Sequence, residues 1–205
     1  MAPLIVDKDQ KKAQIAQAAL RVFARQGTAK TKIADVAIAA GIGKGTIYEY
    51  FESKDALIEY AMHHFFEEIN RDVGAQVFLL TDPREKLSAL IHTTVQAFGN
   101  MGEEGRFLLE VWAEGIRDGK QYFDVKGFYT QYRAMIKAII DEGIRQGLFG
   151  AGNPVMTASI ITGALDGLAL QWVLDEDCFT LKEAADGLCD LVLKGLAPEK
   201  ASDDQ

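Results

Sequence analysis

The segment from residue 31 to 54 constrains this chain most, because it is predicted to form two short helices joined by a glycine turn. Ile33 and Val36 recur at helical spacing and give the first helix one apolar face. Thr31 is predicted to be the N-cap of this helix. Gly41 can adopt the left-handed backbone conformation that ends a helix tightly. The pattern predicts a helix-turn-helix.

The second helix of the pair, predicted from Gly45 to Phe51, has two chemically different faces. Ile47 and Phe51 are four residues apart and are expected to face inward as anchors. The side chains that then point outward are Thr46, Tyr48 and Tyr50. A helix braced on one face and carrying hydroxyl and tyrosyl groups on the other suits the major groove of DNA.

The region from Gly27 to Lys54 resembles the DNA-binding region of the tetracycline-repressor (TetR) family of bacterial regulators. The motifs in that family's order are Ile33-Ala34-Asp35-Val36-Ala37, Ala40-Gly41, Lys44-Gly45-Thr46, Tyr48-x-Tyr50-Phe51 and Ser53-Lys54. The resemblance implies an all-helical dimer whose larger C-terminal part binds a small molecule and releases or repositions the DNA-binding heads. Gly43 departs from the family, which usually has a small polar residue there, and Glu49 places an acid beside the tyrosines.

A set of DNA contacts follows from this resemblance and from the residue chemistry. The predicted contacts are Thr31, Lys32, Gly43, Lys44, Gly45, Thr46, Tyr48, Glu49, Tyr50 and Lys54. Thr46 is expected to meet a base edge, and Glu49 could accept a hydrogen bond from cytosine. Lys44, Lys54 and Thr31, together with the two tyrosines, are expected to meet phosphates, which position the head without reading sequence.

Two other interpretations of this segment were weighed. A nucleotide phosphate loop would need glycine at Ile38, a hydroxyl residue directly after Lys44 and a preceding strand, and none of these is present or predicted. An ordinary helix pair without a role in DNA binding leaves the basic and aromatic turn unexplained in a chain that is acidic as a whole.

Charge is distributed unevenly along the chain. Residues 1–54 carry nine Lys and Arg against five Asp and Glu, a balance of +4, whereas the remainder carries thirteen against twenty-five, a balance of −12. Phosphate contacts are local and are screened within about 10 Å. The basic N-terminal part is therefore compatible with DNA binding although the whole chain has a net charge of −8.

Composition favours an all-α fold of about nine helices. The chain has 205 residues, 48% of them apolar, with only four prolines and little of the alternation typical of strands. We expect an N-terminal three-helix head, residues 1–53, that contains the helix-turn-helix, and a helical body for ligand binding and dimerisation, residues 54–205. The first head helix is expected at about 8–26. The body helices are expected at about 54–71, 84–98, 103–117, 120–146, 154–174 and 180–196.

The sequence also predicts a cytoplasmic protein. The two cysteines lack Cys-x-x-Cys spacing and a secretory context, which favours a reduced compartment. The most apolar segment, Pro154 to Leu165, is about 12 residues long before Asp166 interrupts it, and a membrane span needs about 20.

The last two predicted helices are rich in small and apolar residues. Such a terminal pair, in a chain that already has a core, is typical of an interface, and two copies would form a four-helix bundle about a two-fold axis. We therefore expect a homodimer through these helices, which also presents two heads to two half-sites. The alternative is that the pair only covers the body.

The resemblance places an effector site in the body, at aromatic or polar groups where the family tends to have its cavity. The candidate lining residues are Phe66, His92, Gln96, Phe107, Val111, Trp112, Tyr129, Tyr132, Arg133 and Asp166. For each residue alone, ordinary core packing is the competing role. Arg133 and His92, on otherwise apolar faces, suggest an anionic or acceptor-bearing ligand, although an internal ion pair also explains Arg133.

A metal-dependent helical-bundle enzyme is the alternative function. Glu59, His63 and Glu67 are spaced four apart on one helical face, with His64 adjacent. Carboxylate-bridged di-iron bundles require a Glu-x-x-His pair on each of two helices, and the sequence has none. We therefore expect a solvated helix face here, and predict no catalytic residue, metal or cofactor.

Overall fold

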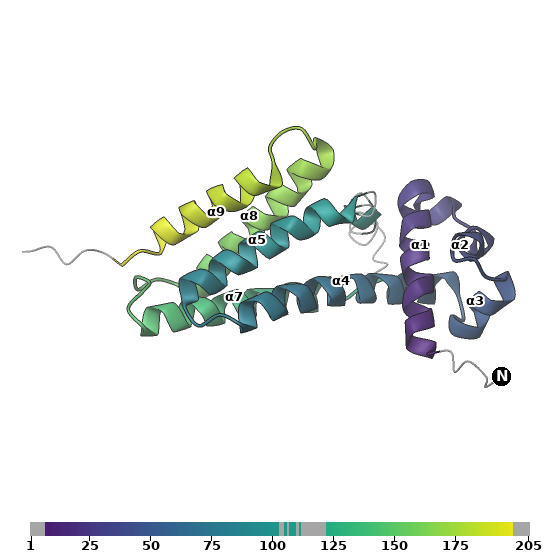
Figure 1. Cartoon of the computed structure of the whole chain (residues 1–205), viewed down its shortest axis with the longest axis horizontal. Helices are drawn as coiled ribbons and strands as arrows, with labels where there is room; N and C mark the ends of the chain where they lie inside the picture. Colours follow the sequence, from purple (N-terminus) through teal and green to yellow (C-terminus); the bar gives the residue numbers. More distant parts are fainter. Residues whose placement is uncertain (1–6, 103–104, 106, 110, 112–121, 199–205) are drawn as a thin grey trace, which may run out of the picture. The chain divides into compact units, whose positions relative to one another are not determined.

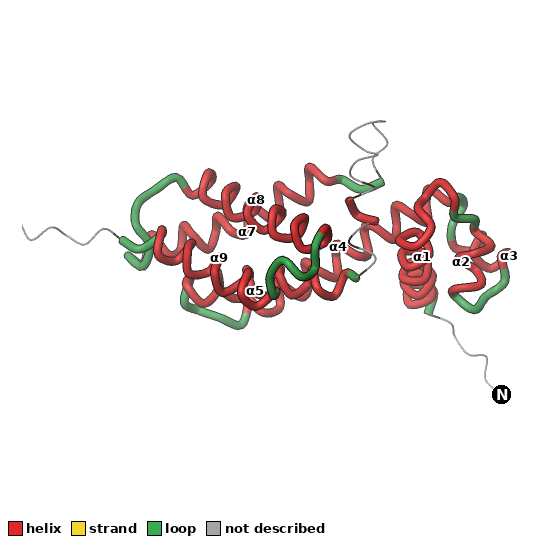
Figure 2. Tube along the Cα trace, turned by 90° about the horizontal axis from the view of Figure 1, so that it is seen from above, coloured by secondary structure: helices red, strands yellow, loops and turns green. Residues whose placement is uncertain are grey.

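The computed structural model describes residues 7–102, 105, 107–109, 111 and 122–198. Within these residues the secondary structure is helical and contains no strand (Figure 2). Eight helices lie in the described part, and residues 105, 107–109 and 111 are also helical. The all-α prediction is confirmed.

The helices begin and end where the sequence supplies caps and breaks. Their bounds are α1 Lys8–Lys30, α2 Ile33–Ala39, α3 Lys44–Tyr50, α4 Lys54–Phe78, α5 Pro83–Met101, α7 Val125–Arg145, α8 Pro154–Leu174 and α9 Leu181–Gly195. The Asn153 side chain accepts a hydrogen bond from the Met156 N–H and so caps α8. Thr180 and Glu183 form a reciprocal capping box at the start of α9.

Some helix bounds differ from the prediction. The first helix was expected to end at about residue 26, and Gly27 indeed has the non-helical angles φ 73° and ψ 162°. Helical turns nevertheless continue beyond Gly27 to Lys30. Helix α4 continues to Phe78 because Val73 and Val77, beyond the predicted end, are buried. Helix α7 begins at Val125, later than predicted.

Helix α8 has the predicted bounds, and Asp166 lies within it. It is the one helix in the described part of the chain that is long and apolar enough to cross a membrane by length and composition, although the apolar segment up to Leu165 was expected to be too short. Only 28% of its most apolar window is buried in the single chain. An apolar surface on α8 is therefore left uncovered.

The chain divides into two compact units, which we describe separately. The first contains α1, α2, α3, the part of α4 that ends at Glu68, and the described residues between 101 and 124. Here α1 packs on α2 and α2 on α3 (Figure 1). The ring of Phe23, on α1, is fully buried and stacks on Phe107 with 5.6 Å between the ring centroids. This core supports the helix-turn-helix.

The second unit contains the remainder of α4 together with α5, α7, α8 and α9. Helix α7 packs along α8, and α8 contacts α9 (Figure 1). A salt bridge of 2.7 Å joins Lys86 on α5 to Glu142 on α7. The predicted boundary separates a DNA-binding head, residues 1–53, from a ligand-binding and dimerisation body, residues 54–205. The two compact units are defined by packing instead, so this functional boundary stays a prediction.

Candidate functional site

The turn between α2 and α3 has the tight geometry that the sequence predicted. Gly41 has φ +66°, a left-handed conformation that glycine adopts without strain. The Ile42 N–H donates to the Ala37 carbonyl at 3.0 Å, so the turn satisfies a carbonyl at the end of α2. Gly43 then becomes the N-cap of α3.

Helix α3 has the two faces expected from its sequence. Ile47 is fully buried and Phe51 nearly so, and the Phe51 ring meets Tyr60 of α4 edge-on at 5.4 Å. On the other face Tyr48 is 49% exposed, and the Lys44 ammonium lies over its ring, 6.0 Å from the centroid. The buried anchors hold α3 in place and leave a cationic and aromatic surface in solvent.

Most of the predicted DNA contacts are accessible. Six are exposed: Lys32, Gly43, Lys44, Gly45, Tyr48 and Glu49. Thr46 and Tyr50 are half-buried. A side chain at Gly45 would meet no atom within 4 Å, so this stretch of backbone is open to an approaching ligand. The surface formed by these eight residues is hereafter the α3 surface.

Thr31 was assigned wrongly. It is only 3% exposed, and its hydroxyl donates to the Gly27 carbonyl at 2.8 Å. Lys32, not Thr31, is the N-cap of α2, and its backbone N–H donates to the Asp35 carboxylate at 2.9 Å. The Thr31 hydroxyl is therefore buried and bonded within the head, and its predicted phosphate contact stays a prediction.

Lys54 has a structural contact that the sequence did not reveal. Its side chain is half-buried, and the ammonium donates a hydrogen bond to the Thr28 carbonyl. This bond joins the first turn of α4 to the segment that follows Gly27. Lys30, in the last turn of α1, is by contrast an exposed cation that the prediction omitted. Lys30 lies within the region from Gly27 to Lys54 that resembles the TetR family, and this position was the signal that could have identified it.

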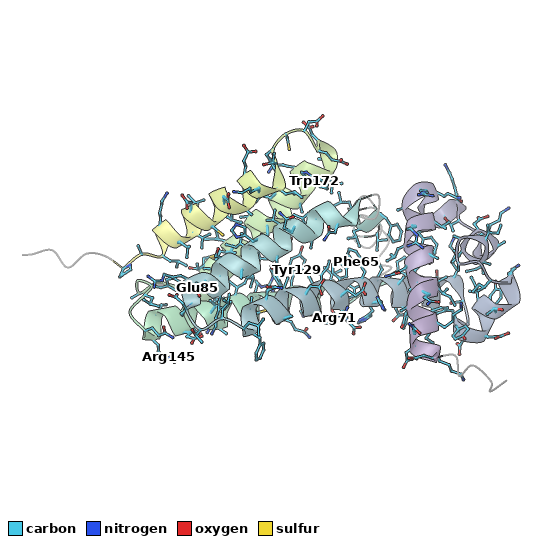
Figure 3. All side chains as sticks on the ribbon, in the orientation of Figure 1. Phe65, Arg71, Glu85, Tyr129, Arg145 and Trp172 are labelled. Atoms are coloured by element: carbon cyan, nitrogen blue, oxygen red, sulfur yellow. The ribbon has the colours of Figure 1, made fainter. Side chains whose placement is uncertain are left out.

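Four of the predicted effector-site residues come together on α7 and α8. The Tyr129 hydroxyl donates a hydrogen bond to the Asp166 carboxylate, and burial followed by this charge raises the pKa of Tyr129 (Figure 3 labels Tyr129). The Arg133 guanidinium lies over the Tyr129 ring, 5.9 Å from the centroid. Tyr132 is buried, and its hydroxyl is 2.7 Å from that of Thr94 on α5.

His92 and Gln96 do not join that group. The His92 Nε2 atom is 2.9 Å from the Asp186 carboxylate of α9, and its Nδ1 atom is 2.9 Å from the Ser88 carbonyl. His92 therefore faces α9 and already has acceptors at both ring nitrogens. Gln96 is exposed to solvent. His92 lines a separate pocket with Ser88, Asp186 and Cys189, and the predicted role of His92 and Gln96 in effector binding stays a prediction.

Three further candidates pack in the first unit. Phe66 stacks on Phe123 with ring centroids 4.4 Å apart, and Phe107 stacks on Phe23 of α1. Val111 is buried in the same unit. The two phenylalanines therefore pack against other rings, which is the core-packing role that we weighed against effector binding for these positions. Trp112 lies outside the described residues.

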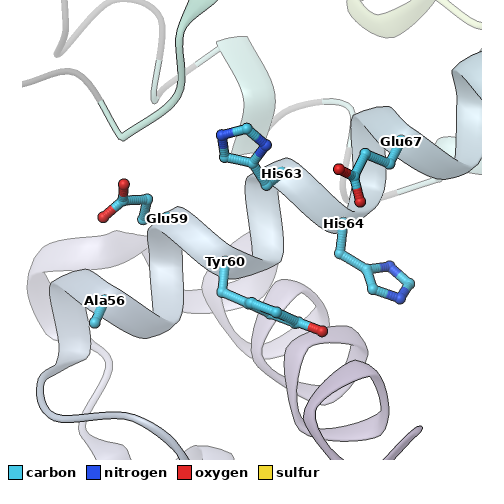
Figure 4. Close-up of a pocket in the computed structure, with 6 residues that line it drawn as sticks. All are labelled: Ala56, Glu59, Tyr60, His63, His64 and Glu67. Atoms are coloured by element: carbon cyan, nitrogen blue, oxygen red, sulfur yellow. The ribbon is translucent and has the colours of Figure 1, made fainter. Parts of the chain in front are cut away.

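The predicted face of α4 with two histidines forms a shallow depression (Figure 4). Figure 4 shows His63 and His64 pointing to different sides of the helix. The His63 ring meets Phe123 edge-on at 5.1 Å, and His64 Nδ1 is 3.5 Å from a Glu68 carboxylate oxygen. Among the described residues, no group of three or more His, Cys, Asp or Glu side chains is arranged to hold a metal ion. The geometry gives a metal-dependent enzyme no support.

Two family models match the chain. The model of bacterial regulatory proteins of the tetR family matches residues 15–61, which include α2 and α3. The model of the C-terminal part of BetI-type transcriptional repressors matches residues 83–197, more than half of the chain. The chain belongs to the TetR family. It is a DNA-binding transcriptional regulator with a ligand-binding C-terminal part.

Relatives of this TetR-family chain match it over nearly its whole length. The regulator BetI of Paraburkholderia xenovorans is 27% identical over 200 residues, covering 93% of this chain and 97% of the relative. A regulator from Saccharomonospora viridis in complex with choline superimposes with a TM-score of 0.79 at 23% identity, covering 93% of this chain and 100% of that one. FadR of Bacillus subtilis in complex with stearoyl-CoA gives 0.74 at 22% identity, covering 89% and 98%. Both structures confirm the fold.

Proposed function

We propose that this TetR-family regulator is a repressor that inserts α3 into the major groove of operator DNA. The observation that carries the proposal is the division of α3 into a buried face, anchored by Ile47 and Phe51, and the α3 surface. A short helix held in this way can present its outer side chains to base edges while its neighbours contact the backbone.

The chemistry of the α3 surface assigns a role to each group. Thr46 and Glu49 contact base edges, Glu49 by accepting a hydrogen bond from a cytosine amino group. Lys32 and Lys44 contact phosphates, as do the hydroxyls of Tyr48 and Tyr50. Because Lys44 lies over the Tyr48 ring, the two side chains restrict each other before DNA is bound.

We propose that the regulator acts as a homodimer through α8 and α9. Both helices expose large apolar side chains in the single chain: Val155, Met156, Ile160, Leu170, Leu174 and Leu191. A two-fold axis along this pair buries the same patch from both copies in a four-helix bundle. The exposed apolar surface of α8 is thereby covered by protein, and the regulator works in the cytoplasm, where its DNA is.

We propose that the controlling small molecule binds in the second unit. The group formed by Tyr129, Arg133 and Asp166 combines polar and aromatic side chains on α7 and α8, and is our candidate for effector contact. An effector alters operator binding only if it binds one of two conformations more tightly, and couplings of about 1–3 kcal/mol are typical. The relatives in complex with choline and with stearoyl-CoA support a small-molecule effector of this kind. The protein has no catalytic role in this proposal.

The test is a selection of bound fragments from the source genome, followed by mobility-shift titration of the recovered duplexes at low ionic strength. Sedimentation equilibrium of the same sample gives the oligomeric state. We expect a dimer and recovered fragments that share a two-fold symmetric sequence. A monomer at micromolar concentration, or equal binding to recovered and random duplexes, would contradict the proposal.

A further inference from the structure

A thiol, an imidazole and a carboxylate meet between α5 and α9, two helices of the second unit (Figure 1). The Cys189 Sγ atom of α9 is 3.5 Å from Nδ1 of His92 on α5. The His92 Nε2 atom is 2.9 Å from a carboxylate oxygen of Asp186 on α9. In this order a base can activate a nucleophile while a third group orients the base. The cluster shares no residue with the group proposed for effector contact.

Hydrogen bonding sets the protonation of the His92 ring. An ionised carboxylate only accepts hydrogen bonds, so the Nε2 atom carries a hydrogen and donates it to Asp186. In the neutral ring Nδ1 is then the nitrogen without a hydrogen, and it lies beside the thiol. When Nδ1 takes up a proton, the Ser88 carbonyl, 2.9 Å away, accepts the hydrogen bond of the new N–H group. The protonated ring therefore has an acceptor at each nitrogen.

The Cys189 thiol needs such a base in order to react. Burial raises the pKa of this thiol, its hydrogen bond with Ser88 opposes the rise, and the charges of Asp186 and Asp190 add to it. The protonated thiol therefore predominates at neutral pH, whereas the thiolate is the nucleophilic form. Transfer of the proton to His92 produces a thiolate 3.7 Å from the Ser88 hydroxyl, which can donate a hydrogen bond to it.

The thiol lines a surface depression together with Ser88 and His92. Only 6% of Cys189 is exposed, so a reagent must enter this depression to reach the sulfur. Addition to an electron-poor alkene suits the cluster, because this reaction needs no oxidant and releases no leaving group. The sulfur forms a bond to the β carbon, the π electrons of the alkene move toward the α carbon, and the imidazolium returns the proton to that carbon. His92 ends neutral, as it began.

We infer that Cys189, His92 and Asp186 form a site of covalent modification for α,β-unsaturated carbonyl compounds. Cys189 is the nucleophile and His92 moves the proton. Asp186 is a positioning residue, and its second carboxylate oxygen is held by the Lys182 ammonium at 2.5 Å. The inference goes beyond the proposed function, because neither operator DNA nor a non-covalent effector takes part in the reaction. Failure of one therefore leaves the other intact.

The experiment measures the rate at which N-ethylmaleimide, an electron-poor alkene, labels each cysteine of the full-length protein. Labelled peptides are quantified by mass spectrometry, so the exposed Cys178, between α8 and α9, serves as an internal standard. At pH 7, His92→Gln should slow the labelling of Cys189 by about 100-fold, the lower end of what a positioned base contributes. The labelling of Cys178 should not change. Unfolding would speed the labelling of Cys189, so misfolding cannot produce the slower rate.

Two further variants separate positioning by Asp186 from the effect of its charge. Asp186→Asn should slow the labelling of Cys189 by about 10- to 100-fold, the value of a hydrogen bond to a charged group. The matched control is Asp190→Asn on the same helix, whose carboxylate pairs with Lys194 at 2.7 Å. Both carboxylates raise the pKa of the thiol, so loss of charge alone predicts faster labelling in both variants. Slower labelling in Asp186→Asn, with unchanged or faster labelling in Asp190→Asn, therefore identifies the hydrogen bond to His92.

The pH profile is an independent measurement. In His92→Gln the rate at Cys189 should rise about tenfold per pH unit between pH 7 and 9, as the thiolate fraction does. Wild type should rise less steeply, because the imidazole accepts the proton. The inference is overturned if Cys189 of wild type stays unlabelled while Cys178 reacts, or if His92→Gln labels Cys189 as fast as wild type does. Equal effects of Asp186→Asn and Asp190→Asn, or equal pH profiles of wild type and His92→Gln, also overturn it.

Discussion

Replacement of Lys44 by alanine tests the α3 surface most directly. Lys44 is exposed at the start of α3, forms no ion pair within the described residues, and holds its ammonium over the Tyr48 ring. Its removal should therefore leave the fold of the head intact. If Lys44 neutralises one phosphate, each half of a dimer loses one contact on the operator. The expected effect is on affinity and its dependence on salt.

The magnitude follows from counterion release. Each phosphate contact contributes about 0.9 to the slope of log affinity against log salt concentration, so the loss of two contacts per dimer makes the slope less negative by about 1.8. Between 50 and 200 mM salt, a fourfold change, the ratio of wild-type to variant affinity should then fall by about 12-fold. Fluorescence anisotropy with one labelled operator over this range measures both slopes.

A matched control keeps this result interpretable. Lys126→Ala removes the same charge from an exposed position on α7, outside the head. Its slope should equal that of wild type, because Lys126 is not among the residues proposed to contact phosphates. If both variants changed the slope equally, or if Lys44→Ala altered the ranking of operator variants and left the slope unchanged, the assignment of Lys44 to a phosphate would be refuted.

Three other predictions address base reading, packing and pH. Thr46→Ala should relax base preference at one position of each half-site by about 1–3 kcal/mol, and an unchanged ranking in competition titrations counts against the contact. Gly143→Ala should lower the free energy of unfolding in urea by about 1–3 kcal/mol or more, because a Cβ atom at this position would lie 2.0 Å from the Phe149 ring. The control, Gly74→Ala in α4, has open space around the new Cβ atom and should raise the free energy of unfolding by about 0.5–1 kcal/mol. Burial raises the pKa of the Asp166 carboxyl, so the folded state holds this proton to a higher pH than the unfolded state does. The free energy of unfolding of wild type, relative to that of Asp166→Asn, should therefore fall as pH rises through the titration of this group. A difference that does not depend on pH would contradict this.

The local structure of the head could be predicted from the sequence, because it depends on residues only a few positions apart. The spacing of Ile47 and Phe51 predicted the buried face of α3, and the glycine at position 41 predicted the left-handed turn. Both follow from backbone geometry within one or two turns of helix. Asn153 was likewise readable as the cap of α8, since a cap bonds to a residue three positions away.

Contacts between distant parts of the chain were not readable in the same way. Thr31 is of a residue type that often forms N-caps, but packing buries its side chain and directs its hydroxyl to the Gly27 carbonyl. The sequence did not reveal that His92 contacts Asp186, 94 residues later in the chain. One sequence provides the residue types on each helix face but not the neighbour that faces them.

The sequence was sufficient for the helical class, the turn and the two faces of α3, because helix formation and capping depend on residues a few positions apart. Tertiary structure alone showed that the carboxylate of Asp166 meets the hydroxyl of Tyr129, and that the rings of Phe23 and Phe107 stack. Those pairings depend on how helices pack in three dimensions, and packing brings together side chains whose separation along the chain carries no periodic signal.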